Sequence, residues 1–532
     1  MAKCEEPGKK IYLSQITQMM SLTDYTDDVS HRLHRLHRFS IRMKIRFCFI
    51  ALISLVAILL CSCDSSTKTQ KGVISGVINL EVQTDYSGIT VMLYTADIVP
   101  EKLKEINNQY PQIAYPIRDK HIFDHRERTP LFTVITNDNG FFSFPEVIYG
   151  KYIITYLKEG WGYNYLFDIE LNAQEISVNN IQEADLTLYP EIIVPATIEG
   201  SYHFLQNHCY VVENDITVLL TSTLNFAKDA KILIAPSKKI TIFGNCSYPE
   251  GEDFAFINSY SGIYSSASSE ILNGEGIVYL GYTGTINNLC IAHQNTGISI
   301  RTDERTLHNL LVRDCVFGIT SLQVNDLEIS NSIIMDNKSQ DAAAINNYTV
   351  SGCNVQDNIF YNNYISLKHE IVKNSVVSNN AFIIGSQEFI NSWESTCEFS
   401  HNLLDNNGVG VENTGKSNLT INFNHIKAKI CVQTYNTRHW ENTVNNGWTK
   451  ANNNNFFASQ YVMESMAPYI YPNELPYPLD FKNNYWNTTS TTEIDELIID
   501  FNDLGLDLIY GVTSIVNYIP FKNGPVAGAG IQ

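Results

Sequence analysis

Basic side chains that could take part in catalysis occur in three short segments of the sequence. They are Arg301, Arg305, Lys368, His369, Arg438 and His439. Histidine or lysine can accept a proton from a substrate, and arginine can stabilise the negative charge that then develops. The segments therefore offer candidates for general acid–base catalysis. The alternative is that they form solvated turns without a role in chemistry.

Other kinds of chemistry leave no trace in the sequence. We find no glycine-rich phosphate loop, no GxSxG nucleophile motif, and no CxxC or Cys/His set with the spacing of a metal site. We therefore predict no metal and no cofactor. The chain carries 36 Lys+Arg against 56 Asp+Glu, a formal net charge of −20. This charge argues against nucleic acid as a partner and weakens the case for a strongly anionic glycan.

A repeat of 22 residues must position any such site. Asn358, Asn380, Asn402 and Asn424 follow one another at this step, each with an apolar residue three positions before it and another two after. The intervening segments are short, alternate apolar with polar residues and favour Val, Ile and Phe, which is typical of strands. Three short strands and three turns fill about 22 residues, so each repeat is one rung of a parallel β-helix. An inward asparagine on each rung predicts a buried ladder of hydrogen-bonded amides.

The repeat continues in both directions with irregular steps. We expect Cys315 and Ser332 to occupy the asparagine position before the regular repeat, and Asn455 and Asn484 to occupy it afterwards. Loops that bulge from one side of a solenoid commonly build its binding face. A second column of apolar residues keeps the 22-residue step and consists of Ile345, Leu367, Phe389 and Val411.

The same step predicts a ligand-binding strip on the outside of the helix. Aromatic faces beside amides and a few charges suit a sugar, because sugars stack on rings and form directional hydrogen bonds. No two carboxylates share a column on adjacent rungs, as a glycosidase would require. The predicted ligand-binding residues are His369, Asn391, Trp393, Asn413, Tyr435 and Trp440.

With these columns, residues 195–532 resemble the right-handed parallel β-helix proteins of the pectate-lyase-like superfamily. The tail FKNNYWNTTSTTEIDELIIDFND is similar to the closing segment of many bacterial members, with Asn487 in place of the usual glycine. Apolar residues at helical spacing predict a helix over Thr492–Asn502 within a cap formed by residues 481–532. The resemblance implies a polysaccharide lyase or hydrolase as an alternative function. The calcium-binding aspartate cluster of such lyases is not visible, so a Lys/Arg pair would have to serve as base and charge stabiliser.

The N-terminal region predicts export and a lipid anchor. A basic segment from Met43 and a nearly apolar run over Phe47–Leu60 precede LCSC, which resembles the bacterial lipobox with Cys63 as the lipidated residue. The run is shorter than the ~20 residues that span a bilayer, so we interpret residues 1–62 as a signal peptide with an N-terminal extension. The alternative is an ordinary signal peptide with incidental cysteines. The aspartates before Met43 suggest that translation begins there, which a precursor peptide from residues 1–42 would refute.

A separate module is expected between a polar tether at 63–72 and the β-helix. Residues 73–190 contain TNDNGFFSF, an Asx-Gly turn with alternating aromatics that predicts a hairpin, and a strand at 151–160. The pattern from Gly76 to Tyr152 resembles the carboxypeptidase regulatory-like modules, which are small transthyretin-like β-sandwiches. The resemblance implies a spacer or docking domain, so the expected fold is all-β throughout, a β-sandwich followed by a β-helix solenoid.

Three functional classes remain open. The first is a bacterial outer-membrane lipoprotein, periplasmic or surface-exposed, whose β-helix presents a glycan-binding or adhesive surface. The second is a polysaccharide lyase or glycoside hydrolase, and the third is a structural envelope protein without a ligand. A catalytic set in the loops at 301–305, 368–370 and 438–441 would favour the enzyme, and a flat aromatic strip would favour glycan binding.

Overall fold

The computed structural model gives an all-β protein, as predicted, with 54% strand and 7% helix. It describes residues 70–181, 185–261, 273–281, 284–340, 342–435, 447–466, 477–504 and 514–532. The predicted signal segment with Cys63 lies outside these residues. Residues 71–532 form one compact unit. Within the described part of the chain, no helix is long and apolar enough to cross a membrane.

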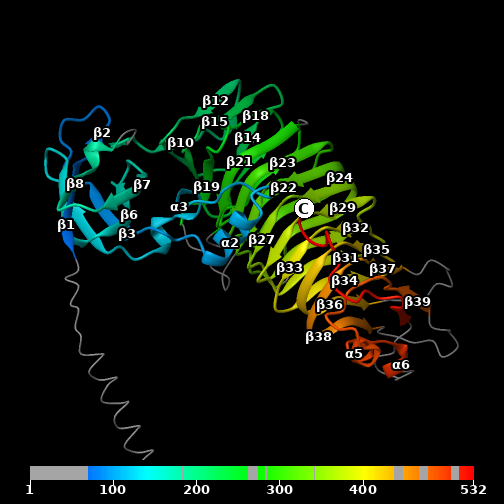
Figure 1. The fold of residues 1–532 in the computed structure, drawn as a ribbon. Helices are drawn as coiled ribbons and strands as arrows, with labels where there is room; N and C mark the ends of the chain where they lie inside the picture. Colours follow the sequence, from blue (N-terminus) through cyan, green and yellow to red (C-terminus); the bar gives the residue numbers. More distant parts are fainter. Residues whose placement is uncertain are drawn as a thin grey trace, which may run out of the picture. The chain divides into compact units, whose positions relative to one another are not determined.

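A parallel β-solenoid of about ten turns forms the larger part of the structure. Its strands stack in sequence order from β10 (Ile192–Ile193) to β41 (Ser514–Asn517), as the succession of colours in Figure 1 shows. The predicted register is confirmed, because Val355 pairs with Val377 and Val377 with Phe399. The side chains on the inner face of each strand form one continuous hydrophobic core. It contains the predicted apolar column of Ile345, Leu367, Phe389 and Val411.

The asparagine ladder lies inside the solenoid, as predicted. Asn358, Asn380, Asn402 and Asn424 are fully buried. The backbone N–H and the Nδ2 of each donate to Oδ1 of the next, at 2.9–3.1 Å. Because every amide is both donor and acceptor, the ladder satisfies polar groups that burial would otherwise leave unpaired.

Two predicted members of the ladder are wrong. Asn454, not Asn455, accepts the bond from the Asn424 backbone at 2.9 Å, and Asn455 is instead the strand residue that pairs with His425. Cys315 donates its backbone N–H to Oδ1 of Asn337 at 2.9 Å, so it belongs to a second ladder on another turn of the same rungs. The predicted members Ser332 and Asn484 are confirmed.

Residues 71–188 form small sheets around a hydrophobic core of their own. The strand predicted at 151–160 corresponds to β6 (Gly150–Leu157), so its last three residues are a turn and not part of the strand. The predicted hairpin is wrong, because the strands on either side of the Asn137 turn pair with different partners, β4 with β3 and β5 with β1. The two larger sheets have the orders β5 (Phe141–Ile148), β1 (Lys71–Val77), β8 (Glu175–Ser177) and β4 (Phe132–Ile135), β3 (Thr90–Thr95), β6 (Gly150–Leu157), β7 (Tyr163–Leu171).

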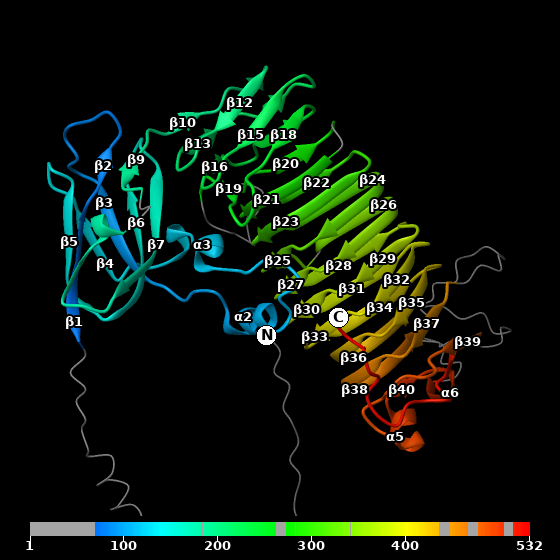
Figure 2. The same ribbon diagram turned by 45° about the horizontal axis from the view of Figure 1, so that its top comes forward.

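The segment between β3 and β4 is an insertion that packs on the outside of the solenoid. It contains α2 (Glu101–Gln109), α3 (Asp119–Ile122) and η1 (His125–Glu127). In Figure 2, α2 lies beside β27 (Ile359–Tyr361) and β30 (Ala381–Ile383). The insertion covers an apolar outer face that water would otherwise contact. That face includes Cys290, Leu311, Ile333, Ile359 and Ala381.

The C-terminal end differs from the single helix predicted over Thr492–Asn502. Helix α5 (Thr491–Glu496) begins there but ends early, and Ile498–Ile499 form strand β40, which pairs with β38 (Asn455–Met466). A short helix α6 (Phe501–Leu504) follows. The open edge of the stack offers unpaired backbone groups, and pairing with them outweighs the helical spacing of the apolar residues.

Candidate functional site

His369, Asn391 and Asn413 of the predicted ligand-binding strip pair in the predicted register, but their side chains face the inside of the solenoid. His369 pairs with Asn391, and Asn391 pairs with Asn413. All three are at most 1% exposed, and Nδ2 of Asn391 donates to Oδ1 of Asn413 at 2.9 Å. The reason is the two-residue alternation of a strand: Leu367 faces the core, so His369 faces it too. The prediction that these three residues contact a ligand is therefore wrong.

The aromatic members of the predicted strip do not follow that column. Tyr435 pairs with Thr414, while Thr434 takes the place opposite Asn413, so the column continues through Thr434 and not through the predicted tyrosine. Trp393 is 58% exposed, in a turn where its φ of 53° is left-handed. Trp440 lies outside the described residues, so its contribution stays a prediction.

The basic candidates within the described residues do not form a catalytic set. Arg301 is exposed in the turn after β22 (Thr296–Ile300), and Lys368 pairs with Glu370 at 2.8 Å. His369 is fully buried, and burial lowers its pKa to about 3, so its ring is neutral at physiological pH. Arg305 is 1% exposed, and its Nε donates to Oγ1 of Thr302 at 2.9 Å. The last two predicted candidates, Arg438 and His439, lie outside the described residues.

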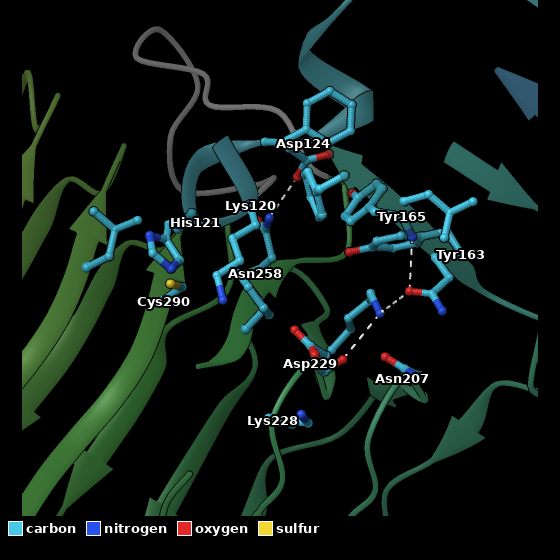
Figure 3. Close-up of a pocket in the computed structure, with 18 of the residues that line it drawn as sticks. Lys120, His121, Asp124, Tyr163, Tyr165, Asn207, Lys228, Asp229, Asn258 and Cys290 are labelled. Atoms are coloured by element: carbon cyan, nitrogen blue, oxygen red, sulfur yellow. Dashed lines mark hydrogen bonds between the residues drawn. The ribbon is translucent and has the colours of Figure 1, made fainter. Parts of the chain in front are cut away.

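A cleft of about 730 Å³ lies where β7 and α3 meet the first turns of the solenoid. This volume is within the range of small-molecule sites. Figure 3 shows Tyr163 and Tyr165 on one side and Cys290 on the other, with His121 of the insertion beside Cys290 and Lys120 between the two sides. The solenoid contributes side chains from β16 (Lys231–Ile234), β19 (Ala255–Ser259), β21 (Gly284–Ala292) and β23 (Arg305–Arg313).

The β7 side of the cleft is aromatic. Tyr163, Tyr165 and Phe167 alternate along the strand and therefore share one face. Their neighbouring ring centroids lie 5.2 and 5.7 Å apart, and each residue is partly exposed. The Tyr165 hydroxyl is fixed by a 2.9 Å hydrogen bond to Nδ1 of His125 in the insertion. Together the rings offer an apolar surface of the kind on which a sugar ring stacks.

The solenoid side brings a buried lysine and several amides to the same cleft. Nζ of Lys231 donates to Oδ1 of Asn164 at 3.1 Å and to the carbonyl oxygen of Asp229 at 3.2 Å. Burial lowers the pKa of Lys231, and burial raises that of the Asp229 carboxyl. Asn207 and Asn258 line the cleft as well. The site therefore combines donors and acceptors with an aromatic surface.

A network of charged residues ties the insertion to the solenoid at the edge of the cleft. Asp124 is 2% exposed and lies 2.6 Å from Nη2 of Arg126. Burial would raise the pKa of Asp124, but the hydrogen bonds and charge of Arg126 bring it below its ordinary value. Glu127 contacts His293 and lies 3.0 Å from Nη1 of Arg313. The carboxylates thus remain ionised against arginines.

Three members of this network could in principle hold a metal ion. The ligand atoms of Asp124, Glu127 and His293 lie within 4.8 Å of one another. Each carboxylate already pairs with an arginine, and Nδ1 of His293 lies 2.7 Å from Oδ1 of Asn258. An ion-pair network accounts for the arrangement, and we assign no metal to it.

Sequence reasoning missed this cleft because its sides come from distant segments. Tyr163 and Lys231 are 68 positions apart, and no repeat links them. Two local signals were available. The run HIFDHRER at 121–128 is densely charged for a loop, and YNYLF at 163–167 alternates aromatic residues on one strand face.

Comparisons with known proteins give similarity to two solved structures of low identity. No protein-family model matches the chain, and neither does any curated protein. A DFA-IIIase from Arthrobacter chlorophenolicus A6 is similar over 61% of this chain and 87% of its own, at 10% identity and a TM-score of 0.31. The Streptococcus pneumoniae surface protein and adhesin PfbA is similar over 50% of this chain and 91% of its own, at 13% identity and a TM-score of 0.23. The similarity carries no argument about ligand or activity.

Proposed function

We propose that this protein is a glycan-binding protein of the bacterial envelope, lipid-anchored at Cys63, whose ligand occupies the cleft beside β7. The observation that supports the proposal is the composition of the cleft. It sets the aromatic face of Tyr163, Tyr165 and Phe167 against amides and charges in a volume of about 730 Å³. Stacking on rings and directional hydrogen bonds are the two interactions that select a sugar.

A glycan array with the full-length protein tests the proposal. Tyr163→Ala removes a ring of the cleft, and Tyr364→Ala removes a 36% exposed ring that does not line it. We expect selective binding that falls by roughly tenfold or more in the first variant and stays unchanged in the second. Melting temperatures of both variants check that they fold. Equal effects of the two substitutions, or no binding to any glycan, would contradict the proposal. The third functional class, a structural envelope protein without a ligand, would then be favoured.

Glycoside hydrolysis is the second candidate, and the environment of Asp229 favours it. Its raised pKa suits a carboxyl group that donates a proton to a leaving group, while Asp124 stays ionised in the same cleft. Both oxygens of Asp124 are occupied by Arg126 and Asn258, which argues against its use as a nucleophile or base. Mass spectrometry of a bound glycan after incubation with the protein distinguishes hydrolysis from binding. Shortened products that form with the wild-type protein but not with Asp229→Asn would support the enzyme.

A further inference from the structure

Lys231 is a cation in an otherwise uncharged outward column of the solenoid. Strand pairing places Cys209 before it and Phe256 after it, and the column continues to Cys290 and Leu311. Farther along, the insertion covers this column with apolar side chains. At Lys231 the column lines the cleft instead, and the residue is only 4% exposed. A cation at this position therefore needs an explanation that packing does not supply.

Among the described residues, no carboxylate forms a direct ion pair with Lys231; the carboxylates of Asp229 and Asp185 act on its charge only from farther away. The buried guanidinium groups of the same region do have one: Arg126 pairs with Asp124, and Arg313 with Glu127. Within the described part of the chain, the hydrogen bonds of the Lys231 ammonium go to an amide oxygen and a backbone carbonyl, both neutral, and the ring of Tyr163 lies 5.9 Å away. An ammonium has three N–H donors, so one is left for a ligand. Buried charges are normally paired.

We propose that Lys231 anchors a single oxyanion of the ligand, a carboxylate, sulfate or phosphate group, in the cleft beside β7. The inference rests on the proposed function and narrows its ligand to a glycan that carries such a group. The oxyanion accepts the third N–H of Lys231, and the sugar ring extends over the tyrosines. An anion at this point also compensates the buried charge, which water cannot reach well.

The charge around the cleft is compatible with one anion although the chain is acidic. The lining contains four cations, Lys120, Lys228, Lys231 and Arg313, and four carboxylates, Asp124, Asp168, Asp185 and Asp229. The full chain has an excess of carboxylates, 56 against 36 cations. Asp124 is neutralised by Arg126, and Asp185 accepts from Asn207 at 2.7 Å. Because cations and carboxylates are equal in number in the lining, the ligand's anion meets a less acidic surface there than on the chain as a whole, while a polyanion would meet the acidic remainder.

Asn164→Asp gives the sharpest variant, because it fills the anion position from within the protein. Its carboxylate would lie where the amide oxygen now accepts from Lys231, with the shape of the side chain preserved. Lys231→Met removes the charge directly. Lys450→Met is the control, since Lys450 is exposed, pairs with Asp480 at 3.7 Å and does not line the cleft.

The array should carry each glycan in neutral, carboxylated, sulfated and phosphorylated form. We expect the full-length protein to prefer one anionic form over its neutral parent by roughly tenfold or more. Asn164→Asp and Lys231→Met should lose that preference, and Lys450→Met should keep it. Binding that depends on Tyr163 but ignores the anion and both variants would overturn this inference and leave the proposed function standing.

A second measurement keeps the inference testable if no glycan binds. Melting temperatures of the full-length protein are followed during titration with acetate, sulfate or inorganic phosphate, with chloride holding the ionic strength constant. We expect one of these anions to give a saturable rise that Asn164→Asp lacks. Sulfate and phosphate also stabilise proteins without binding, so an equal, unsaturated rise in both proteins counts against an anion site.

Discussion

The backbone N–H and the side-chain Nδ2 of Asn402 both donate to Oδ1 of Asn424, at 2.9 and 3.1 Å. The same relationship repeats from rung to rung, and each Nδ2 also donates to a backbone carbonyl. One side chain per rung therefore holds its own turn and the next. These hydrogen bonds keep neighbouring rungs in register over the part of the solenoid where every rung has 22 residues.

Asn402→Leu should destabilise the solenoid. The substitution leaves the Asn380 backbone N–H and the Val377 carbonyl without their partner inside the core. Each buried polar group left unpaired costs about 1–3 kcal/mol. Chemical denaturation measures the loss, with Glu398→Gln on an exposed position of the same rung as a control that should change stability by less than about 0.5 kcal/mol. Equal losses would mean that the ladder adds no stability.

The sequence predicts the structure correctly where the 22-residue repeat is unbroken. The four asparagines were predictable because no insertion separates them, and the step to Asn454 grows to 30 residues, which displaced the predicted member by one position. The inward orientation of His369 was predictable as well, since it stands two residues after the core residue Leu367. The cleft was not, because burial of Lys231 depends on an insertion and a strand from other parts of the chain.

Glu388 should make stability fall as the pH rises. Its side chain is fully buried, and burial raises its pKa from 4.5 to about 7. Between these values the folded protein holds a proton that the unfolded chain has released, so each step up in pH favours unfolding. The effect is on the order of 3 kcal/mol across the window. Denaturation curves from pH 4.5 to 7 measure it, and Glu388→Gln should remove this dependence. A variant with the wild-type pH profile would show that another group is responsible.

Arg313→Met should loosen the insertion. Arg313 is 6% exposed and lies between Glu127 of the insertion and Asp314 of the solenoid, at 3.0 and 2.6 Å. Removing one partner of a buried ion pair costs about 3–5 kcal/mol, because the other charge stays buried. Hydrogen exchange of α3 should speed up along with the loss of stability. Lys427→Met, which breaks an exposed pair with Asp405, should cost at most about 1 kcal/mol. Unchanged hydrogen exchange in α3 would show that the ion pair does not hold the insertion on the solenoid.

Cys63→Ser should release the protein from the membrane. The prediction rests on the lipobox-like LCSC after an apolar run that is too short to span a bilayer. A single substitution at the proposed lipidation site removes the anchor that we infer. Fractionation of cells, with Cys61→Ser as the control, should move the first variant alone to the soluble fraction. Retention of Cys63→Ser in the membrane would refute the anchor.

A crystal structure with the best-bound glycan tests the central claim most directly. The account predicts a sugar ring against Tyr163 or Tyr165 in the cleft, with an anionic group within hydrogen-bond distance of Nζ of Lys231. A glycan bound at another surface of the solenoid, such as the exposed face of Trp393, with the cleft empty, would contradict it.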